Sequence, residues 1–310
     1  MLTLPTRTRL TAVAAVVAVL LPLSACGGDP TSTTASSGDS STITIGSANF
    51  PENELLAEMY AQALEAQDVK VTRKFNIGAR ELYLKALEDG SIDLLPEYNG
   101  ALLAALSPKG EVPQSVSTPD EVYDALQKVL PKGTQTLPQS AAEDKDTLTV
   151  TEETASKYDL KTIGDLKPVA GQMSLAAAPE FDKRYQGVVG LEKVYGVKFK
   201  EFKALDAGGP LTKAALEKGD VEVANIFSTD SAIETENLVV LEDTKNLFLA
   251  QNILPLITKA KVNGTVEDAL NKVSEALTTE DLTEYLAKVQ VDKQDPATVA
   301  KEYLSDKKLV

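Results

Sequence analysis

The sequence predicts an α/β protein made of two similarly wound lobes with a ligand cleft between them. From residue 42 on, apolar runs of four to seven residues alternate with helical patterns, which is typical of open, largely parallel sheets. In addition, the stretch ALEDGSIDLLPEYNG at residues 86–100 returns as ALEKGDVEVANIFS at residues 215–228, at an offset of 129 residues. A helix, a glycine, a strand and an aromatic residue follow one another in both copies, which indicates two related halves.

The first strand and helix show the pattern clearly. Residues 42–45 (TITI) are expected to form a strand. A helix is expected over residues 51–67, because apolar side chains recur there at helical spacing: Leu55, Leu56, Met59, Ala63 and Leu64. Pro51 suits its first turn, because a proline there loses no helix hydrogen bond.

The remaining elements continue the alternation. A second helix is expected over residues 80–88 and is closed by Gly90. The other strand candidates are, in chain order, residues 69–75, 92–95, 147–151, 173–177, 198–203, 221–226, 238–241 and 253–258.

The repeat also indicates where a ligand would bind. Residues 86–88 align with residues 215–217, and Tyr98 aligns with Phe227. In open α/β sheets, ligands bind beyond the carboxyl ends of the strands. We therefore expect both rings to reach a cleft between the lobes. The alternative is that such helix–glycine–strand turns recur in many unrelated α/β proteins.

The first 41 residues are interpreted as a signal peptide and a tether. Two arginines precede an apolar run over residues 10–21, which is too short for a comfortable membrane span. The following LSACG at residues 23–27 resembles the lipobox of bacterial lipoproteins. This implies removal of residues 1–25 and acyl chains on Cys26 that hold the protein to a membrane. An ordinary secretory signal, or an uncleaved anchor, with a coincidental cysteine is the alternative.

Residues 26–41 are polar and rich in Ser and Thr, so they cannot bury enough apolar surface to fold. They are predicted to be a disordered tether between the anchor and the folded part.

Composition excludes several classes of function. The net charge of −15 repels nucleic acid, so a phosphate-backbone partner is not expected. The chain has no histidine and a single cysteine, which excludes Ser–His–Asp and Cys–His catalysis and the usual zinc sites. No cofactor, metal or enzymatic activity is predicted. Carboxylate acid–base chemistry, Ser–Lys chemistry and carboxylate-bound metals stay open.

Several blocks of residues carry a resemblance to one family. NFPE at residues 49–52 with LAEMY at residues 56–60, and IDLLPEYNG at residues 92–100, resemble motifs of osmoprotectant-binding proteins. Those are solute-binding subunits of ABC importers for glycine betaine, choline and related quaternary amines. Further matching blocks lie at residues 161–166, 179–181, 227–230, 238–243 and 295–302.

The resemblance implies a two-lobed periplasmic-binding-protein fold of type II, with two open mixed sheets, a hinge and a ligand cleft between the lobes. Lobe one would hold residues 42–146 and 250–310, and lobe two would hold residues 147–249. The lobes would close on a small-molecule ligand. The closed form, expected to be a monomer, would dock on a membrane permease that works with an ATPase.

Four aromatic residues are candidates for holding a quaternary ammonium, which is attracted to ring faces: Phe50, Tyr98, Phe181 and Phe227. Tyr98 follows a strand at the expected rim of the cleft, and Phe50 and Phe181 lie in strand-to-helix loops. The alternative for each is packing in the core or, for Tyr98, over the adjacent helix.

A ligand carboxylate would require cations or free N–H groups. The helix that starts near Pro51 has a positive N-terminus close to Asn49. Arg80, at the start of the next helix, could make a two-pronged contact with a carboxylate. Lys145 could reach the cleft from the crossing between the lobes. Exposed, solvated charges are the alternatives for Arg80 and Lys145.

The chain departs from the betaine-binding pattern at the expected site. DKD at residues 144–146 stands where the family often has a ring, and no aromatic residue follows Gly209 in the glycine loop of the second half. A cage of four rings is therefore not expected. Three carboxylates could instead pair with a cationic ligand, although Glu81 is more readily explained as solvated: Glu52, Glu81 and Glu97. The set of candidate ligand-binding residues is completed from stretches that align with the family: Glu52, Gly209 and Thr229.

Two functions fit these features of the sequence. The first is an extracytoplasmic, lipid-anchored solute-binding subunit of an ABC importer for a quaternary amine. The second keeps the fold but makes the protein a small-molecule sensor or scaffold that signals without transport. An enzyme working with paired carboxylates is a third possibility, which nothing favours beyond the presence of acids.

Overall fold

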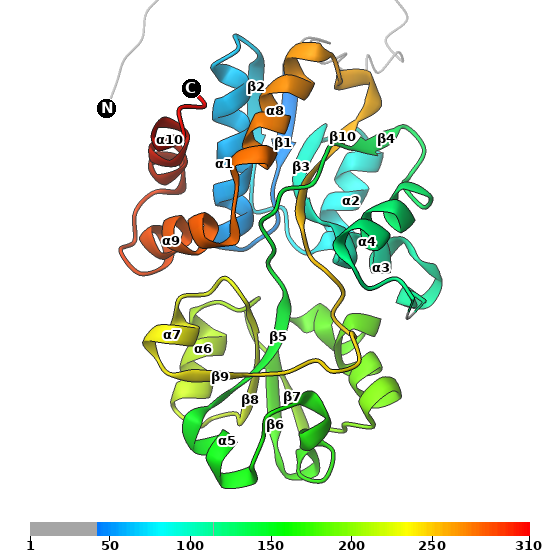
Figure 1. Ribbon diagram of the computed structural model, residues 1–310, viewed down its shortest axis with the longest axis vertical. Coiled ribbons are helices and arrows are strands. Elements are labelled where there is room, and N and C mark those ends of the chain that lie inside the picture. The colour runs from blue at the N-terminus through cyan, green and yellow to red at the C-terminus, as the bar shows by residue number, and fades with distance from the viewer. Residues whose placement is uncertain (1–41, 114) are drawn as a thin grey trace, which may run out of the picture. The chain divides into compact units, whose positions relative to one another are not determined.

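The computed structural model describes residues 42–113 and 115–310, which fold around two five-stranded mixed sheets (Figure 1). The strand order is β2-β1-β3-β10-β4 in the first sheet and β7-β6-β8-β5-β9 in the second. The predicted α/β class with two open mixed sheets is thereby confirmed. The predicted signal peptide, the tether and Cys26 lie outside the described residues.

In the first sheet, parallel and antiparallel pairings meet at β3 (Leu94–Tyr98). The strand β1 (Thr42–Gly46) pairs in parallel with β2 (Lys70–Lys74) and with β3. The strand β10 (Ile253–Thr258) pairs antiparallel with β3 and with β4 (Thr134–Thr136). The sheet thus combines strands from both ends of the described chain.

Helices cover both faces of this sheet (Figure 1). Leu94 packs in a cluster with residues of four helices on one face: α1 (Pro51–Glu65), α8 (Gly264–Ala276), α9 (Thr279–Gln290) and α10 (Pro296–Asp306). Its neighbour Leu95 packs with three others on the opposite face: α2 (Arg80–Glu88), α3 (Asn99–Leu106) and α4 (Pro119–Gln127). Burial on both faces explains why β10 is a continuous apolar run, ILPLIT.

The second sheet has the same plan. The strand β6 (Ser174–Ala177) pairs in parallel with β7 (Glu201–Ala204) and β8 (Val223–Phe227). The strand β5 (Asp146–Thr151) pairs antiparallel with β8 and with β9 (Leu238–Leu241). Three short helices belong to this sheet: α5 (Glu152–Tyr158), α6 (Pro210–Glu217) and α7 (Ala232–Thr235).

The two sheets are equivalent strand by strand, since β2-β1-β3 corresponds to β7-β6-β8. The repeat at the 129-residue offset therefore marks β3 and β8, which end at Tyr98 and Phe227. We call the elements around the first sheet (β1–β4, β10, α1–α4 and α8–α10) the first lobe. The elements around the second sheet (β5–β9 and α5–α7) form the second lobe.

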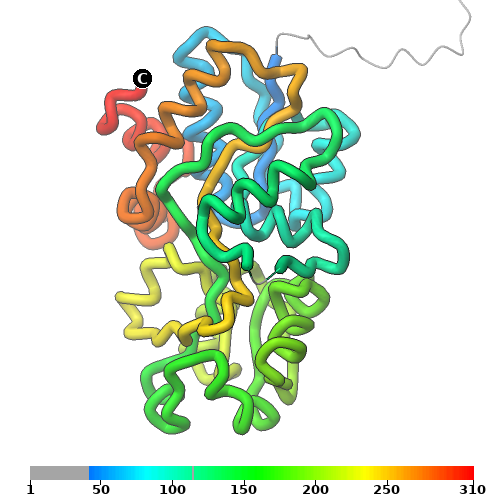
Figure 2. Tube along the Cα trace, turned by 45° about the vertical axis from the view of Figure 1, so that its right-hand side comes forward, coloured from blue at the N-terminus to red at the C-terminus, as the bar shows by residue number. Residues whose placement is uncertain are grey.

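Two connections join the lobes, residues 137–145 and residues 242–252, and part of each lies beside the other (Figure 2). The backbone N–H of Asp144 donates to the carbonyl of Gln251 at 3.2 Å, and that of Ile253 donates to the carbonyl of Ala142 at 3.1 Å. The described residues belong to one compact unit, so the predicted lobe boundaries stay a prediction.

Local sequence signals explain several element ends. Pro51 opens α1 as predicted, although the helix ends at Glu65, two residues earlier than expected. At α10, the Asp295 side chain accepts hydrogen bonds from the backbone N–H groups of Ala297 and Thr298, and Pro296 occupies the first turn. Within the described residues, no helix is both long and apolar enough to span a bilayer.

Candidate functional site

A cavity of about 60 Å³ lies between side chains of both lobes. Its first-lobe wall includes Asn49 and Phe50, which follow β1, and Tyr98 at the end of β3. Its second-lobe wall includes Phe181, which follows β6, and Phe227 at the end of β8. The cavity thus lies beyond the carboxyl ends of the parallel strands, where open α/β sheets bind ligands.

Three rings from the two lobes form one cluster at this cavity. The ring centroid of Phe50 lies 6.1 Å from that of Tyr98 and 5.2 Å from that of Phe227. We call these three residues the aromatic cluster. Phe181 also lines the cavity, but its ring packs against Phe248 with a centroid distance of 6.4 Å. The arrangement offers ring faces from both lobes to one small volume.

A glycine makes room for the Phe227 ring. Gly208 has a φ of +60°, a backbone conformation that side-chain-bearing residues seldom adopt. A Cβ at this position would lie 2.9 Å from Cδ2 of Phe227. The glycine loop before α6 therefore shapes the cavity through the ring it supports.

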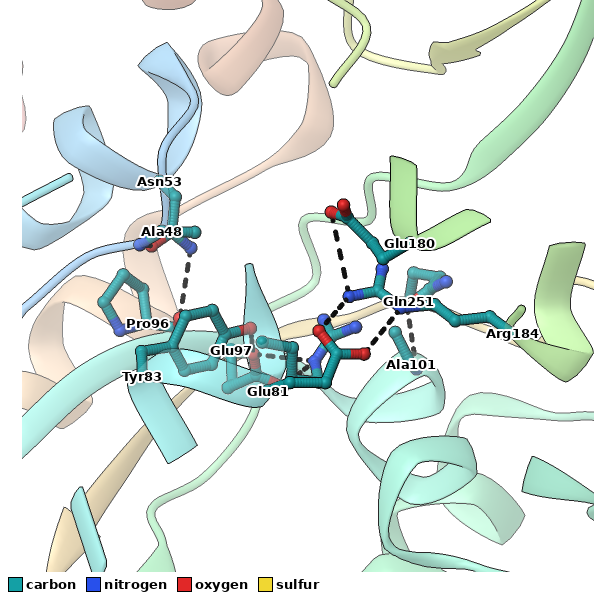
Figure 3. A network of polar contacts seen from close by, with 11 residues as sticks. Ala48, Asn53, Glu81, Tyr83, Pro96, Glu97, Ala101, Glu180, Arg184 and Gln251 are labelled. Carbon is teal, nitrogen blue, oxygen red and sulfur yellow. Dashed lines mark hydrogen bonds and ion pairs between the residues drawn. The ribbon is translucent and has the colours of Figure 1, made fainter. Parts of the chain in front are cut away.

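A buried ion pair joins Arg80, which lines the cavity, to Glu97, which is labelled with Tyr83 in Figure 3. The Nε of Arg80 donates to both carboxylate oxygens of Glu97 at 3.1 Å, and the Tyr83 hydroxyl donates to the same carboxylate. Burial opposes the charge on Arg80, but the Glu97 carboxylate outweighs it and raises the pKa of the guanidinium above its usual value. Arg80 is therefore held in its charged form beside the cavity.

Two nitrogen atoms of the Arg80 guanidinium have no partner in the described residues. Among the described residues, its Nη1 and Nη2 groups make no hydrogen bond, because only Nε is used by Glu97. Arg80 itself lines the cavity. A guanidinium with two free donor groups is suited to bind a carboxylate.

Buried carboxylates lie behind the aromatic cluster. Glu52 accepts a hydrogen bond from the Tyr98 hydroxyl at 2.7 Å and one from the Thr229 hydroxyl of the second lobe at 2.5 Å. Asp144 accepts from the backbone N–H of Thr229 at 3.1 Å and from the Ser228 hydroxyl at 3.2 Å. Because its hydroxyl is engaged by Glu52, Tyr98 presents mainly its ring to a ligand.

Burial raises the pKa of both carboxyl groups. The pKa of Asp144 lies well above its usual range, because burial disfavours the carboxylate and the neighbouring Glu52 adds like charge. The pKa of Glu52 is raised by burial, although hydrogen bonds from Thr229 and Tyr98 act against this rise. The two carboxyl groups, Glu52 and Asp144, therefore keep a proton to higher pH than exposed carboxyl groups do.

A second acid from the same segment faces the cavity directly. Asp146 lines it and accepts a hydrogen bond from the amide of Asn225 at 3.1 Å. Burial raises the pKa of Asp146, and the hydrogen bond from Asn225 and the charges of Arg184 and Arg80 oppose that rise.

Ion pairs join the lobes at the rim. Arg184 of the second lobe makes a two-pronged contact with Glu81 of α2, with N–O distances of 3.0 and 2.9 Å (Figure 3). It also lies 3.9 Å from Glu180. At another point, Lys193 pairs with Glu111 of the first lobe at 3.2 Å.

The structure brings most of the predicted ligand-binding residues together. Six of them line the cavity: Asn49, Phe50, Arg80, Tyr98, Phe181 and Phe227. Three others line a small neighbouring pocket behind the Phe50 and Phe227 rings: Glu52, Gly209 and Thr229. Lys145 lines neither, since its ammonium group pairs with Glu143 at 3.1 Å and the side chain is 41% exposed.

Sequence reasoning missed several cavity residues, including Asp146, Asn225 and Arg184. For Asp146 a signal existed. In an extended segment, alternate residues share a face, so Asp144 and Asp146 lie together and Lys145 lies opposite. Arg184 had no comparable signal, because it follows a short 3₁₀ turn in an irregular stretch.

A comparison with protein families decides what kind of protein this is. The OpuAC family, described as the substrate-binding domain of ABC-type glycine betaine transport systems, matches residues 41–306. The chain belongs to this family. As an OpuAC domain, it is a substrate-binding protein of an ABC transporter and not an enzyme.

Curated relatives of this OpuAC domain are distant but cover most of it. The chain is 26% identical over 270 residues to a carnitine transport binding protein of Listeria monocytogenes, which covers 85% of this chain and 86% of the relative. It is also 26% identical over 279 residues to a glycine betaine-binding protein of Escherichia coli strain K12, which covers 86% of this chain and 91% of the relative.

Solved structures agree with the fold. A crystal structure of a glycine betaine/carnitine/choline ABC transporter is 25% identical, with a TM-score of 0.67 over 86% of this chain and 99% of the other. Lactococcal OpuAC in its closed form with glycine betaine is 15% identical, with a TM-score of 0.59 over 86% of this chain and 96% of the other. The predicted fold of a type II periplasmic binding protein is thus confirmed.

Proposed function

We propose that this protein captures a quaternary amine between its lobes and delivers it to the permease of an ABC importer. The observation that carries the proposal is the aromatic cluster, in which Phe50 and Tyr98 of the first lobe meet Phe227 of the second at one cavity. An ammonium group that carries only methyl groups makes no N–H hydrogen bonds and is attracted to ring faces. Each good ring contributes about 0.5–2 kcal/mol.

The charges around the cluster support a cationic group in this position. Asp144 and Asp146 line the same cavity as the three rings. A cation bound near the rings would favour the ionised form of these carboxyl groups, and the carboxylates would then add to the attraction of the ring faces. The relatives named for carnitine and glycine betaine make the same class of ligand the first to test.

Capture is proposed to occur by closure of the lobes about the two connections, residues 137–145 and 242–252. Contacts between the lobes would form as they close, above all the hydrogen bond from Thr229 to Glu52. A ligand that touches rings of both lobes binds only the closed arrangement in full, so it shifts the population towards that arrangement.

The experiment is isothermal titration calorimetry of the full-length chain with choline, glycine betaine and carnitine. Tyr98→Ala and Phe227→Ala should each weaken binding of the preferred solute at least about tenfold, the loss of one good contact. Phe202→Ala is the matched control, because Phe202 is also partly buried but lies on the edge strand β7, outside the cavity. Its affinity should stay within about threefold of the wild type.

The outcome that contradicts binding at the cluster is an unchanged affinity in both Tyr98→Ala and Phe227→Ala. Transport is tested separately by uptake of the labelled solute in cells that lack the protein. If such cells keep the normal uptake rate although the purified protein binds the solute, the importer role fails. A sensor that binds without transport would then be the better explanation.

We also propose an extracytoplasmic location with a lipid anchor at Cys26, which rests on the lipobox-like LSACG at residues 23–27. The variant Cys26→Ser should lose the acyl chains and appear in the wash fraction of cells instead of the membrane fraction. Retention of Cys26→Ser in the membrane fraction would rule out the anchor while leaving the binding role untouched.

A further inference from the structure

A second cavity adjoins the one at the aromatic cluster. It measures about 280 Å³, against about 60 Å³ for the first. Five residues line both cavities, so the two are direct neighbours: Arg80, Ala101, Asp146, Phe181 and Arg184. We call this second cavity the annex. A cavity larger than the first therefore lies beside a ligand bound at the cluster.

Both lobes build the annex. The first lobe contributes α3 and the turn η1 (Pro108–Gly110), which carries Lys109. The second lobe contributes the segment from Phe181 to Gln186, which includes Lys183 and Arg184. Like the first cavity, the annex therefore has all of its walls only when the two lobes are in contact.

The two cavities differ in charge. The annex is lined by four cationic side chains, Arg80, Lys109, Lys183 and Arg184, against two carboxylates, Glu81 and Asp146. The first cavity shares both arginines but has three carboxyl groups, Asp144, Asp146 and Glu180. The balance of ionisable side chains thus shifts towards cations from the first cavity to the annex.

Two of the annex cations have no protein partner. Among the described residues, the ammonium groups of Lys109 and Lys183 form no ion pair and no hydrogen bond, whereas the structure gives many other lysines a carboxylate. Arg184 is engaged by Glu81, whose side chain is 59% exposed. An anion in the annex would meet two cations without a protein partner, Lys109 and Lys183, beside Arg184.

We propose that the annex is a subsite for the anionic end of an elongated zwitterion, whose quaternary ammonium group lies against the aromatic cluster. The proposal rests on the proposed function, since it assumes that the cluster binds the ammonium group. A carboxylate next to that ammonium, as in a short betaine, would reach Arg80 but would also lie beside Asp144 and Asp146. A carboxylate on a longer chain passes these acids and reaches Arg184 and Lys109.

The test is calorimetry of the full-length chain with choline and with trimethylammonio carboxylates whose two charges are separated by one, three or four methylene groups. The wild type should bind a longer zwitterion at least about tenfold more tightly than the one-methylene compound. Lys109→Gln and Arg184→Gln should each remove most of this preference. Lys109→Gln, which lies outside the cavity at the aromatic cluster, should leave the affinity for choline, which has no anionic end, within about threefold of the wild type.

Lys193→Gln is the control, because it also removes a cation that joins the lobes, at Glu111, but lies outside both cavities. It should keep the preference for the longer zwitterion. Lys109 is exposed and unpaired, so Lys109→Gln tests the annex without disturbing the fold or the Arg184–Glu81 pair.

Three results would overturn the annex. One is a wild type with no chain-length preference. Another is a preference that survives in both Lys109→Gln and Arg184→Gln, and the third is an equal loss of affinity for choline in Lys109→Gln. If choline binds through the cluster in any of these cases, the proposed function stands and only the annex fails. If no quaternary amine binds, the proposed function fails and the annex proposal fails with it.

Discussion

At the scale of single residues, a buried carboxylate next to the cavity fixes the position of a charged side chain that lines it. Glu97 is fully buried and binds both Arg80 and Tyr83, so it positions the guanidinium that lines both cavities. Removing one partner of a buried ion pair leaves the other charge uncompensated. Glu97 therefore orients Arg80 beside the cavity and stabilises the fold through the same contact.

The substitution Glu97→Gln should lower the free energy of unfolding by about 3–5 kcal/mol, because the buried Arg80 charge loses its counterion. Urea denaturation of the full-length chain measures this change. Glu88→Gln on the exposed side of α2 is the matched control and should change the value by less than about 0.5 kcal/mol. A loss for Glu97→Gln as small as that of the control would contradict the structural role of the pair.

Some residues of the site can be anticipated from the sequence, and others cannot. Phe50 and Tyr98 are predictable, because a strand precedes each and an α/β sheet places such positions at its ligand-binding edge. The contact of Phe50 with Phe227 could not be predicted from the sequence, because these rings belong to different lobes and meet only through the way the lobes pack. Thr229 is predicted as a ligand residue, yet its hydroxyl is already used by Glu52.

At the scale of elements, the sequence pattern predicts type and order better than bounds. The strand expected at residues 92–95 is observed as Leu94–Tyr98. Its bounds follow from pairing with β10, a strand from far along the chain, whose residues 253–257 lie opposite residues 98–94. The strand β4 has three residues and no alternation long enough to detect. The glycine loop before α6 is visible in the sequence, but its role in supporting Phe227 emerges only from the structure.

That loop carries a prediction. Gly208→Ala should lower the affinity for quaternary amines at least about tenfold, because the new methyl group collides with the Phe227 ring and moves it out of the aromatic cluster. Gly219→Ala is the control, since Gly219 has a comparable φ of +73° but a Cβ added there would meet no atom within 4 Å. Calorimetry should find near-normal affinity in Gly219→Ala. Equal losses in both would mean that backbone strain, and not the ring, is responsible.

At the scale of the whole molecule, the sequence repeat predicts two related lobes, each with its own sheet. It does not predict the polar contacts between the lobes. The contact of Glu52, Thr229 and Asp144 links the first lobe, the second lobe and a connection between them. It encloses acidic side chains whose pKa values burial raises. The proposed closure of the lobes would therefore be coupled to protonation at this point.

This coupling has a defined sign. The folded state holds the proton of Asp144 to higher pH than the unfolded chain does, so the unfolded chain ionises first and the folded state loses relative stability as pH rises above about 4. Asp144→Asn removes this titration. The stability of the wild type relative to Asp144→Asn should thus be greater at about pH 4.5 than at about pH 8, as measured by urea denaturation.

A difference between wild type and Asp144→Asn that does not change with pH would show that Asp144 titrates normally in the folded protein. A suitable control is Asp120→Asn, at an exposed position in the first turn of α4. It should show no comparable trend, because Asp120 lies away from Glu52 and Thr229.

The central claim is that one quaternary ammonium group touches rings of both lobes at once. The most direct test is nuclear Overhauser spectroscopy of the full-length chain saturated with choline, reading contacts from the N-methyl protons to assigned aromatic rings. The account predicts contacts to Phe227 of the second lobe together with Phe50 or Tyr98 of the first. Contacts confined to one lobe, or to rings outside this cluster, would contradict it.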